Sequence, residues 1–268
     1  MTAVLWLAAL AMASTVSGAN PAPSKVISSI DLAQPFHTRS AWTFTATQGP
    51  DIPDPTGEEG QVAGAITLCL SRDAGKTCDH VLTDAFAKAN DDDLFTEPHS
   101  LVQVEIDHLP GPDARPLFFL KTASVLSTDG NARVVTQILL YDRARDAFTL
   151  AWQHSSGHNN SEALRYVPDG PLAGDLITAE PTQDKPYGFW VTVNKLSAKS
   201  RFEQVLNYRS ATRYGDGNPL SVIDSELPNI EQHLGLWHPG QPLPKPAVPC
   251  PKPHLVKGAL WCQYAGVK

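Results

Sequence analysis

The sequence lacks the motifs that mark the familiar cofactor-dependent and nucleophilic enzymes. It contains no GxGxxG, no GxxxxGK[ST], no GxSxG and no HExxH. The two glycine-rich motifs cradle nucleotide phosphates, GxSxG places a nucleophilic serine on a strand-to-helix turn, and HExxH holds zinc. Their absence argues against a nucleotide cofactor, a serine hydrolase and a zinc protease of the common kinds.

No cluster of basic residues is present in the sequence either. The chain has 21 Lys and Arg against 28 Asp and Glu, which gives a formal net charge of −7. The basic residues are scattered singly along the chain. Phosphate backbones are bound by a concentrated basic face, so this composition argues against a nucleic-acid partner.

The chain also has no apolar run long enough to span a bilayer, which takes about 20 residues. Its longest run, Val4 to Ala13, has the length of a signal-peptide core, and small residues follow up to Ala19. No Lys or Arg precedes this run. We expect residues 1–19 to be a signal peptide and the protein to be exported to the periplasm or the medium. The alternative is a buried N-terminal helix.

The cysteines are few and even in number. Cys69, Cys78, Cys250 and Cys262 all follow the expected cleavage site. Exported chains form disulfides by default, and we expect local pairing, Cys69 with Cys78 and Cys250 with Cys262, because each pair encloses a short turn-rich loop. The rival, a zinc site of four thiolates, would need a CxxC spacing that the sequence does not have.

The pattern of apolar residues predicts an all-β fold. The 23 prolines require many turns, because proline is excluded from helix interiors and central strands. Segments with strand character recur every 12–20 residues or so, separated by Gly, Asp and Pro turns, which favours an antiparallel sheet array of sandwich or propeller type over a βαβ fold. The expected strands are 41–46, 64–70, 101–106, 116–125, 131–141, 147–153, 163–167, 175–180, 188–196, 201–212 and 260–264.

Four regions of the chain follow from this pattern: the signal peptide 1–19, an arm at 20–40, a β-rich domain at 41–238 and a proline-rich strap with a terminal strand at 239–268. The strands 131–141 and 147–153 form a hairpin around a five-residue turn at 142–146. Short helical turns are expected near 81–89 and 220–234, with Pro228 at a first helical position.

Two histidines form the first candidate site. His154 and His158 are four residues apart, but Gly157 and two asparagines between and after them favour a polar turn over a helix. In a ligand-facing loop these imidazoles would bind a ligand or transfer protons. The simpler interpretation, which we favour, is a polar turn after a strand in which neither histidine binds a ligand.

The second candidate site is the loop from Tyr214 to Asn218 together with Asp224 and Glu226, and it overlaps a further candidate, the segment from Tyr208 to Asp224. It holds charged, amide and phenol side chains around two glycines, which suit either a pocket lining or a buried network with an Arg–Asp pair. Its oxygen ligands would also suit calcium, although the EF-hand positions do not match. The candidate residues here are Arg209, Arg213, Tyr214, Asp216, Asn218, Asp224 and Glu226.

A carboxylate pair of the glycosidase kind is a third option. Such a pair needs two carboxyl groups about 5–10 Å apart, which a sequence does not reveal. The available acids are Asp175, Glu180, Asp224 and Glu226. The strand aromatics Trp152, Tyr166, Phe189 and Trp190 are expected in the core rather than at a sugar-stacking surface.

Together these features predict an exported β-rich binding or inhibitor-type module without a catalytic motif, which recognises a protein or an envelope glycan and needs no cofactor. The texture of strands and Asp–Gly turns is similar to that of exported β-repeat proteins, and it assigns no residue a role. The alternative is an exported hydrolase, acting on a saccharide through carboxylates or histidines. The two differ in whether segments 154–160 and 208–224 meet at one place in the fold.

Overall fold

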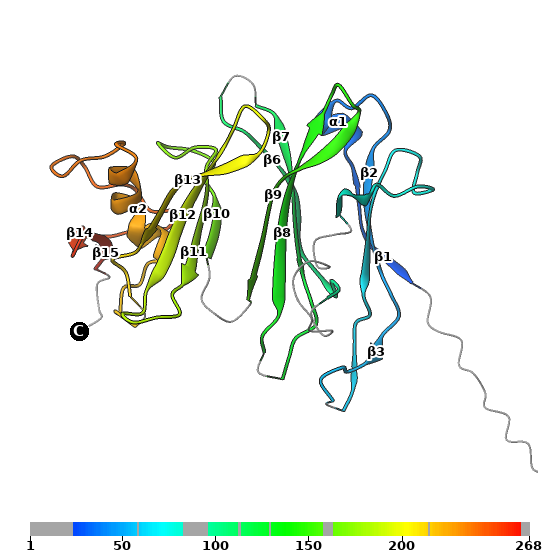
Figure 1. Cartoon of the computed structure of the whole chain (residues 1–268), viewed down its shortest axis with the longest axis horizontal. Coiled ribbons are helices and arrows are strands. Elements are labelled where there is room, and N and C mark those ends of the chain that lie inside the picture. The colour runs from blue at the N-terminus through cyan, green and yellow to red at the C-terminus, as the bar shows by residue number, and fades with distance from the viewer. Residues whose placement is uncertain are drawn as a thin grey trace, which may run out of the picture.

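The computed structural model describes residues 24–57, 59–82, 96–111, 114–128, 130–157, 163–213 and 215–263. They form three antiparallel sheets that follow one another along the long axis of the molecule (Figure 1). Sheet I has the order β1-β2-β5, sheet II β6-β7-β8-β9 and sheet III β10-β11-β12-β13, and two small hairpins, β3-β4 and β14-β15, complete the β structure. The expected all-β antiparallel array is confirmed.

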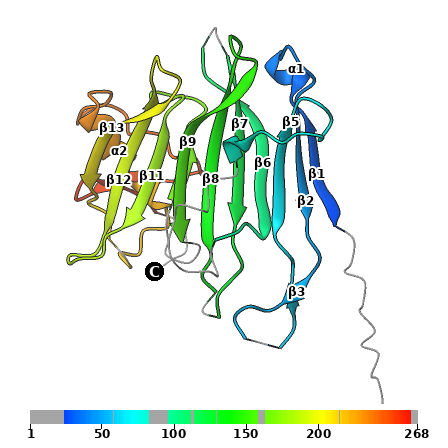
Figure 2. The same cartoon turned by 45° about the vertical axis from the view of Figure 1, so that its right-hand side comes forward.

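The strands of the three sheets run in similar directions, as Figure 2 shows. Their bounds are β1 Lys25–Asp31, β2 Thr43–Gln48, β3 Ile52–Pro53, β4 Gln61–Val62, β5 Ile66–Ser71, β6 Ser100–His108, β7 Pro116–Ala123, β8 Arg133–Asp142, β9 Ala147–Gly157, β10 Ala163–Tyr166, β11 Leu176–Pro181, β12 Phe189–Leu196, β13 Phe202–Arg209, β14 Pro253–Val256 and β15 Ala259–Cys262. The helical elements are α1 Ala33–Phe36, the 3-10 turn η1 His80–Leu82 and α2 Val222–His233.

Sheet II is the central layer, and its two faces pack on different neighbours. Side chains of a strand alternate between the faces of its sheet. Along β7, Phe118 and Leu120 join the cluster shared with sheet I, whereas Leu117 and Phe119 join the cluster shared with sheet III. This double burial explains why β7 and β8 are almost continuously apolar.

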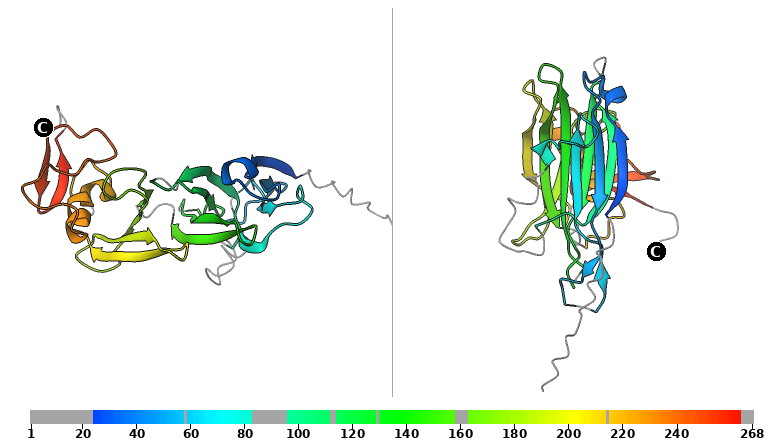
Figure 3. Two further views of the ribbon diagram at one scale, coloured as in Figure 1. Left: turned by 90° about the horizontal axis from the view of Figure 1, so that it is seen from above. Right: turned by 90° about the vertical axis from the view of Figure 1, so that its right-hand side faces the viewer.

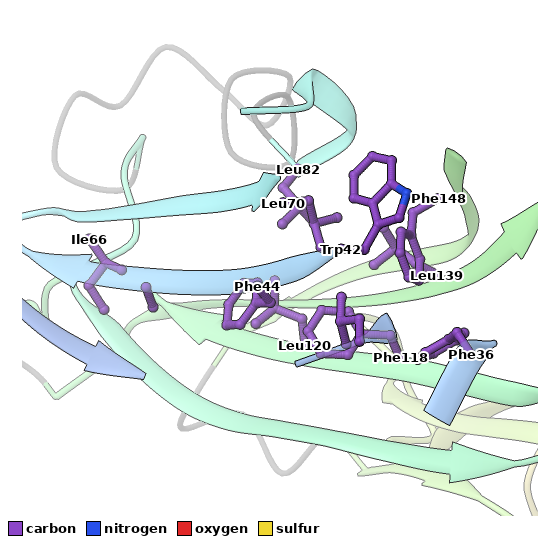
Figure 4. Close-up of a cluster of buried hydrophobic side chains, with 12 residues drawn as sticks. Phe36, Trp42, Phe44, Ile66, Leu70, Leu82, Phe118, Leu120, Leu139 and Phe148 are labelled. Atoms are coloured by element: carbon purple, nitrogen blue, oxygen red, sulfur yellow. The ribbon is translucent and has the colours of Figure 1, made fainter. Parts of the chain in front are cut away.

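The core between sheets I and II is rich in aromatic side chains (Figure 4). Phe44 of β2 contacts Phe118 of β7 with ring centroids 5.1 Å apart. Phe36 of α1 and Trp42 both pack edge-on against Phe148 of β9. The segment expected to be an N-terminal arm therefore contributes β1 and α1 to this layer.

Sheet III is covered on its outer face by helix α2. Ile177 of β11 and Val191 of β12 pack there against Ile223, Leu227 and Ile230. The layers thus follow the chain in order, from sheet I through sheets II and III to α2, as the view from above shows (Figure 3).

Helix α2 departs from the sequence prediction. It is one helix of 12 residues with Pro228 in its interior, not one or two turns that begin at Pro228. An interior proline costs about 3 kcal/mol. The apolar stripe Ile223, Leu227 and Ile230 buries enough surface to offset this cost, and Ser221 caps the helix by accepting from the Asp224 amide.

Two other predictions differ in detail. The turn between β8 and β9 has four residues, because Asp142 already pairs with Ala147. The helix expected at 81–89 is only the 3-10 turn η1 where the structure describes it, and residues 83–89 lie outside the described part. Within the described ranges, no helix is long and apolar enough to cross a membrane.

Both expected disulfides are present. Cys69 of β5 is bonded to Cys78, and Cys250 of the strap is bonded to Cys262 of β15, with Cα atoms 5.0 and 5.3 Å apart. The second bond ties the proline-rich segment to the hairpin β14-β15, which contacts α2. The strap is therefore fixed to the outer layer of the fold.

Candidate functional site

His154 lies in a strand and not in a turn. It belongs to β9, which extends to Gly157 because the long apolar strand β8 pairs with it throughout, Thr136 opposite His154. The imidazole stacks on Trp152 with ring centroids 5.5 Å apart. Its Nε2 is 3.6 Å from Oε1 of Glu180, on β11 of sheet III. His158, the other candidate histidine, lies outside the described residues.

Glu180 begins a lateral row of three side chains across sheet III. In register, Glu180 is opposite Trp190 of β12, and Trp190 is opposite Arg209 of β13. Directly paired residues of antiparallel strands share a face. Their neighbours Ala179, Val191 and Tyr208 pack with α2, so the row faces the opposite way, towards sheet II.

Trp190 is the exception among the aromatics expected in the core. Phe189 is buried and Trp152 and Tyr166 are half-buried, but Trp190 is 42% exposed. The reason is the period of the strand, which buries Phe189 and Val191 against α2 and places Trp190 on the opposite face of the sheet. The next row on the same face contains Thr192 and Asn207, whose Nδ2 donates to the threonine hydroxyl at 2.7 Å. We call these five residues, Glu180, Trp190, Arg209, Thr192 and Asn207, the Trp190 face.

Arg209 holds the loop beside the Trp190 face. Its guanidinium donates to the carbonyl oxygens of Asp184 and Pro186 at 2.7 and 2.6 Å and to the Asp184 carboxylate at 3.2 Å. The expected Arg–Asp pairing thus exists, but its acid lies outside the segment 208–226. This loop also contains Tyr187, an exposed residue three positions before Trp190 in the sequence.

The surroundings of His154 favour the neutral form of its imidazole. Burial lowers the pKa of its imidazole, and the nearby Glu180 carboxylate raises it only in part. At neutral pH the 3.6 Å contact is therefore one between a neutral ring and a carboxylate. A neutral imidazole can still accept a proton or a hydrogen bond from a ligand.

The second candidate segment divides into two parts. Arg209 lies on the Trp190 face, two strands away from Glu180, and it is Glu180 that contacts His154. Asp216 and Asn218 lie beyond it in a turn, where the Asp216 carboxylate accepts from the Asn218 amide at 2.9 Å and from the Arg213 amide at 3.4 Å. Among the described residues Arg213 makes no other hydrogen bond or ion pair, and Tyr214 lies outside the described part of the chain.

Asp224 and Glu226 are buried structural acids of α2. Asp224 forms a bidentate ion pair with Arg165 of β10, at 2.6 and 2.9 Å. Glu226 accepts from Thr212, Tyr208 and Asn229. Their oxygens are thus occupied by protein donors, and among the described residues no group of three or more His, Cys, Asp or Glu could hold a metal ion. The calcium option has no support in this arrangement.

Asn218 belongs to the same buried network. Its side-chain amide donates to the Ser225 hydroxyl at 2.8 Å and to the Leu260 carbonyl oxygen at 2.7 Å. It joins the turn at 215–220 to α2 and to β15. The sequence offered no signal for Arg165, because only tertiary contact brings it to Asp224.

The carboxylates proposed for glycoside cleavage do not pair. Asp175 precedes β11 and Glu180 is near its end, so about 16 Å of strand separates them. Asp224 and Glu226 are on the other face of sheet III, in contact with the residues named above. Among the four acids, Glu180 alone is on the Trp190 face.

Asp175 carries a pH-dependent prediction. It is 3% exposed, one carboxylate oxygen has no hydrogen-bond partner, and burial raises the pKa, which Lys195 offsets only in part. A raised pKa means that the folded state holds the proton more tightly, so ionisation costs stability above that pKa. We expect Asp175→Asn to raise the free energy of unfolding by about 1–2 kcal/mol at pH 7.

The gain from Asp175→Asn should shrink as the pH falls through the raised pKa of the folded state and should be gone below the unfolded value of about 4, because the wild-type acid is then protonated in both states. Urea unfolding at several pH values measures it. The exposed Asp51→Asn serves as the control that removes a charge without burial. A lower stability of Asp175→Asn at pH 7 would contradict the prediction.

The chain matches no protein-family model, no curated protein and no solved structure. The interpretation of the Trp190 face therefore rests on its own chemistry.

Proposed function

We propose that the protein is an exported binding module that holds a saccharide of the cell envelope on the Trp190 face. The observation that carries the proposal is the exposed indole of Trp190, with a carboxylate on one side and a guanidinium on the other, in register across three strands. Sugar rings present apolar C–H faces and hydroxyl edges. An aromatic platform with a few fixed polar groups complements both.

The polar groups of the face are suited to hydroxyl recognition. Glu180 accepts hydrogen bonds and lies directly opposite the indole on β11, while Asn207 of β13, which donates and accepts, lies in the next row, opposite Thr192. All three are carried by paired strands of a four-stranded sheet, which fixes their spacing. Such a rigid arrangement reduces the entropy that binding must overcome.

Export is supported by two independent features of the chain. The apolar segment 4–13 and the small residues up to Ala19 fit a signal peptide. Two disulfides close local loops in the mature part, and such bonds persist in oxidising compartments. Envelope glycans are the saccharides that a protein in this location meets.

A hydrolase is the second candidate, and one contact favours it. His154 and Glu180 come from different sheets and lie 3.6 Å apart. A carboxylate beside an imidazole can pass a proton to or from a substrate. In that case Trp190 would position the sugar and the pair would act on the glycosidic bond.

Trp190→Ala is the variant that tests the binding function. We expect it to weaken binding by about thirty-fold, because a tryptophan that the ligand covers at a recognition site typically contributes 2 kcal/mol or more to the binding free energy. The measurement is binding to immobilised peptidoglycan, chitin, mannan and dextran. Leu255→Ala, which removes a side chain 41% exposed on β14, is the matched control and should bind as the wild type does.

The hydrolase alternative is separated from binding in the same samples. Release of reducing ends by the wild type, lost in Glu180→Gln and His154→Ala, would replace the binding proposal by the hydrolase. Equal binding by Trp190→Ala and the wild type, or no binding by the wild type to any of the four glycans, would refute a saccharide site at this face.

A further inference from the structure

A cleft of about 1220 Å³ opens at the end of the molecule opposite His154. It is lined by α1 and by the turns that join β6 to β7, β8 to β9 and β12 to β13, so it draws on all three sheets. In Figure 1 the turns β8–β9 and β12–β13 lie at the top, at the same end of the molecule as α1. His154 is seven residues along β9 from this end, about 23 Å at the rise of a strand.

The described lining of the cleft is strongly basic. Five exposed cationic side chains contribute to it, against one carboxylate, that of Asp142. They are Arg115, Arg143, Arg145, Lys199 and Arg201. The cleft lining is fewer than a tenth of the residues of the chain, yet it contains about a quarter of the 21 Lys and Arg. The protein as a whole has a net charge of −7.

This cluster is not visible in the sequence, because its members come from three separate hairpins. Each of them has only one or two basic residues, which in the sequence appear scattered. The stacking of sheets II and III brings the β8–β9 and β12–β13 turns to the same end. The basic face missing from the sequence is thus assembled by the fold.

Most of these cations have no acidic partner in the part of the chain that the structure describes. Arg145 lies 3.6 Å from the Asp142 carboxylate, and this is the one ion pair that a cation of the cleft forms among the described residues. Arg115, Arg143, Lys199 and Arg201 are available to an external anion. Their mutual repulsion would be relieved by such a ligand.

The hairpin tip that carries Arg143 is held in place from sheet I. Arg39 donates through its guanidinium to the carbonyl oxygens of Arg143 and Ala144, and through its amide to the Tyr141 hydroxyl. That hydroxyl in turn donates to Asp146. The tip is therefore fixed before any ligand arrives, which favours affinity.

We infer that this basic cleft binds the acidic groups of an anionic polysaccharide. Four of the five cations are arginines, whose planar guanidinium groups pair bidentately with carboxylate, sulfate and phosphate groups. A single-stranded nucleic acid would also need exposed aromatic faces for its bases. Apart from the imidazoles of His37 and His108, the described aromatic residues of the cleft are Phe36, 2% exposed, and Tyr141, which is half-buried and bonded to Asp146.

This inference does not depend on the Trp190 face. The two sites lie at opposite ends of the stack and share no residue. Binding at the basic cleft is expected to weaken with salt, because exposed charges are screened. Binding at the Trp190 face is expected to change little, which allows the two to be measured separately.

The test compares two triple variants of equal net charge. R143A/K199A/R201A removes three cations of the cleft, and R72A/K76A/K245A removes three exposed cations elsewhere. The probes are dextran sulfate, polygalacturonate, neutral dextran and a single-stranded DNA oligonucleotide. We expect the wild type to bind both acidic polysaccharides, the cleft variant to bind them at least ten-fold more weakly, and the control variant to bind within two-fold of the wild type.

Melting temperatures of both variants establish that each is folded. An equal loss in the two triple variants would assign binding to overall charge and overturn the inference. Tighter binding of the oligonucleotide than of either polysaccharide would overturn the ligand class. Binding of neutral dextran as tight as that of the acidic polysaccharides, and lost in the cleft variant, would overturn the role of charge. If Trp190→Ala alone abolishes binding of the acidic polysaccharides, the cleft is not their site.

Discussion

Replacing Arg165 with alanine is expected to lower the free energy of unfolding by about 3–5 kcal/mol, because it leaves a buried carboxylate without its cation. Asp224, 1% exposed, receives two hydrogen bonds from this guanidinium. It also accepts from the Ser221 hydroxyl and from the Ala247 amide, both at 2.8 Å. One carboxylate thus links sheet III, the start of α2 and the proline-rich strap, and it cannot move into solvent without releasing all three.

The loss in Arg165→Ala should depend on pH. Burial alone would raise the pKa of Asp224, but the hydrogen bonds from Arg165, Ala247 and Ser221 outweigh it and hold the pKa below its usual range. A lowered pKa stabilises the fold above the unfolded value of about 4, and this stabilisation is lost as the pH falls through the folded value.

Urea unfolding at pH 7 and at pH 3 measures this effect. The deficit of Arg165→Ala relative to the wild type should be larger at pH 7. Arg72→Ala, an exposed arginine, should change stability by no more than about 0.5 kcal/mol. A deficit below about 1 kcal/mol at pH 7 would show that the strap and helix do not rely on this pair.

The sequence was sufficient for the parts of the fold set by local patterns. Alternating apolar residues and turn residues located the β8–β9 hairpin, and loop composition identified Cys69–Cys78 and Cys250–Cys262. The length of helix α2 was predicted too short, because a proline such as Pro228 is a local signal for a helix start or break. Its cost is offset by burial against sheet III, which no local pattern contains.

The candidate sites were predictable only in part, for a related reason. His154 and Glu180 were both candidates, but their contact depends on how sheets II and III stack. Trp190 was assigned to the core because aromatic side chains usually are buried. The face it occupies is decided by the strand's register, and a shift of one residue would reverse it.

Glu226→Ala is expected to cost about 3–5 kcal/mol of unfolding free energy, since it removes the acceptor of four hydrogen bonds, two of them fully buried. Glu226 is 0% exposed. One oxygen accepts from the Thr212 amide and hydroxyl at 2.8 and 2.6 Å. The other accepts from the Tyr208 hydroxyl and from the Asn229 amide, both at 2.9 Å. Burial, together with the Glu226 carboxyl, raises the pKa of Tyr208, so the phenol remains a donor.

Two further variants separate the hydrogen bonds from the space that the side chain fills. Glu226→Gln keeps the volume and one acceptor oxygen, and the Tyr208 hydroxyl can rotate to accept from the new amide, so its cost should be nearer 1–2 kcal/mol. Glu105→Ala, on the exposed side of β6, should be close to neutral. Chemical unfolding gives all three values. If Glu226→Gln costs as much as Glu226→Ala, then the negative charge matters more than the acceptor count, and the network needs the carboxylate as such.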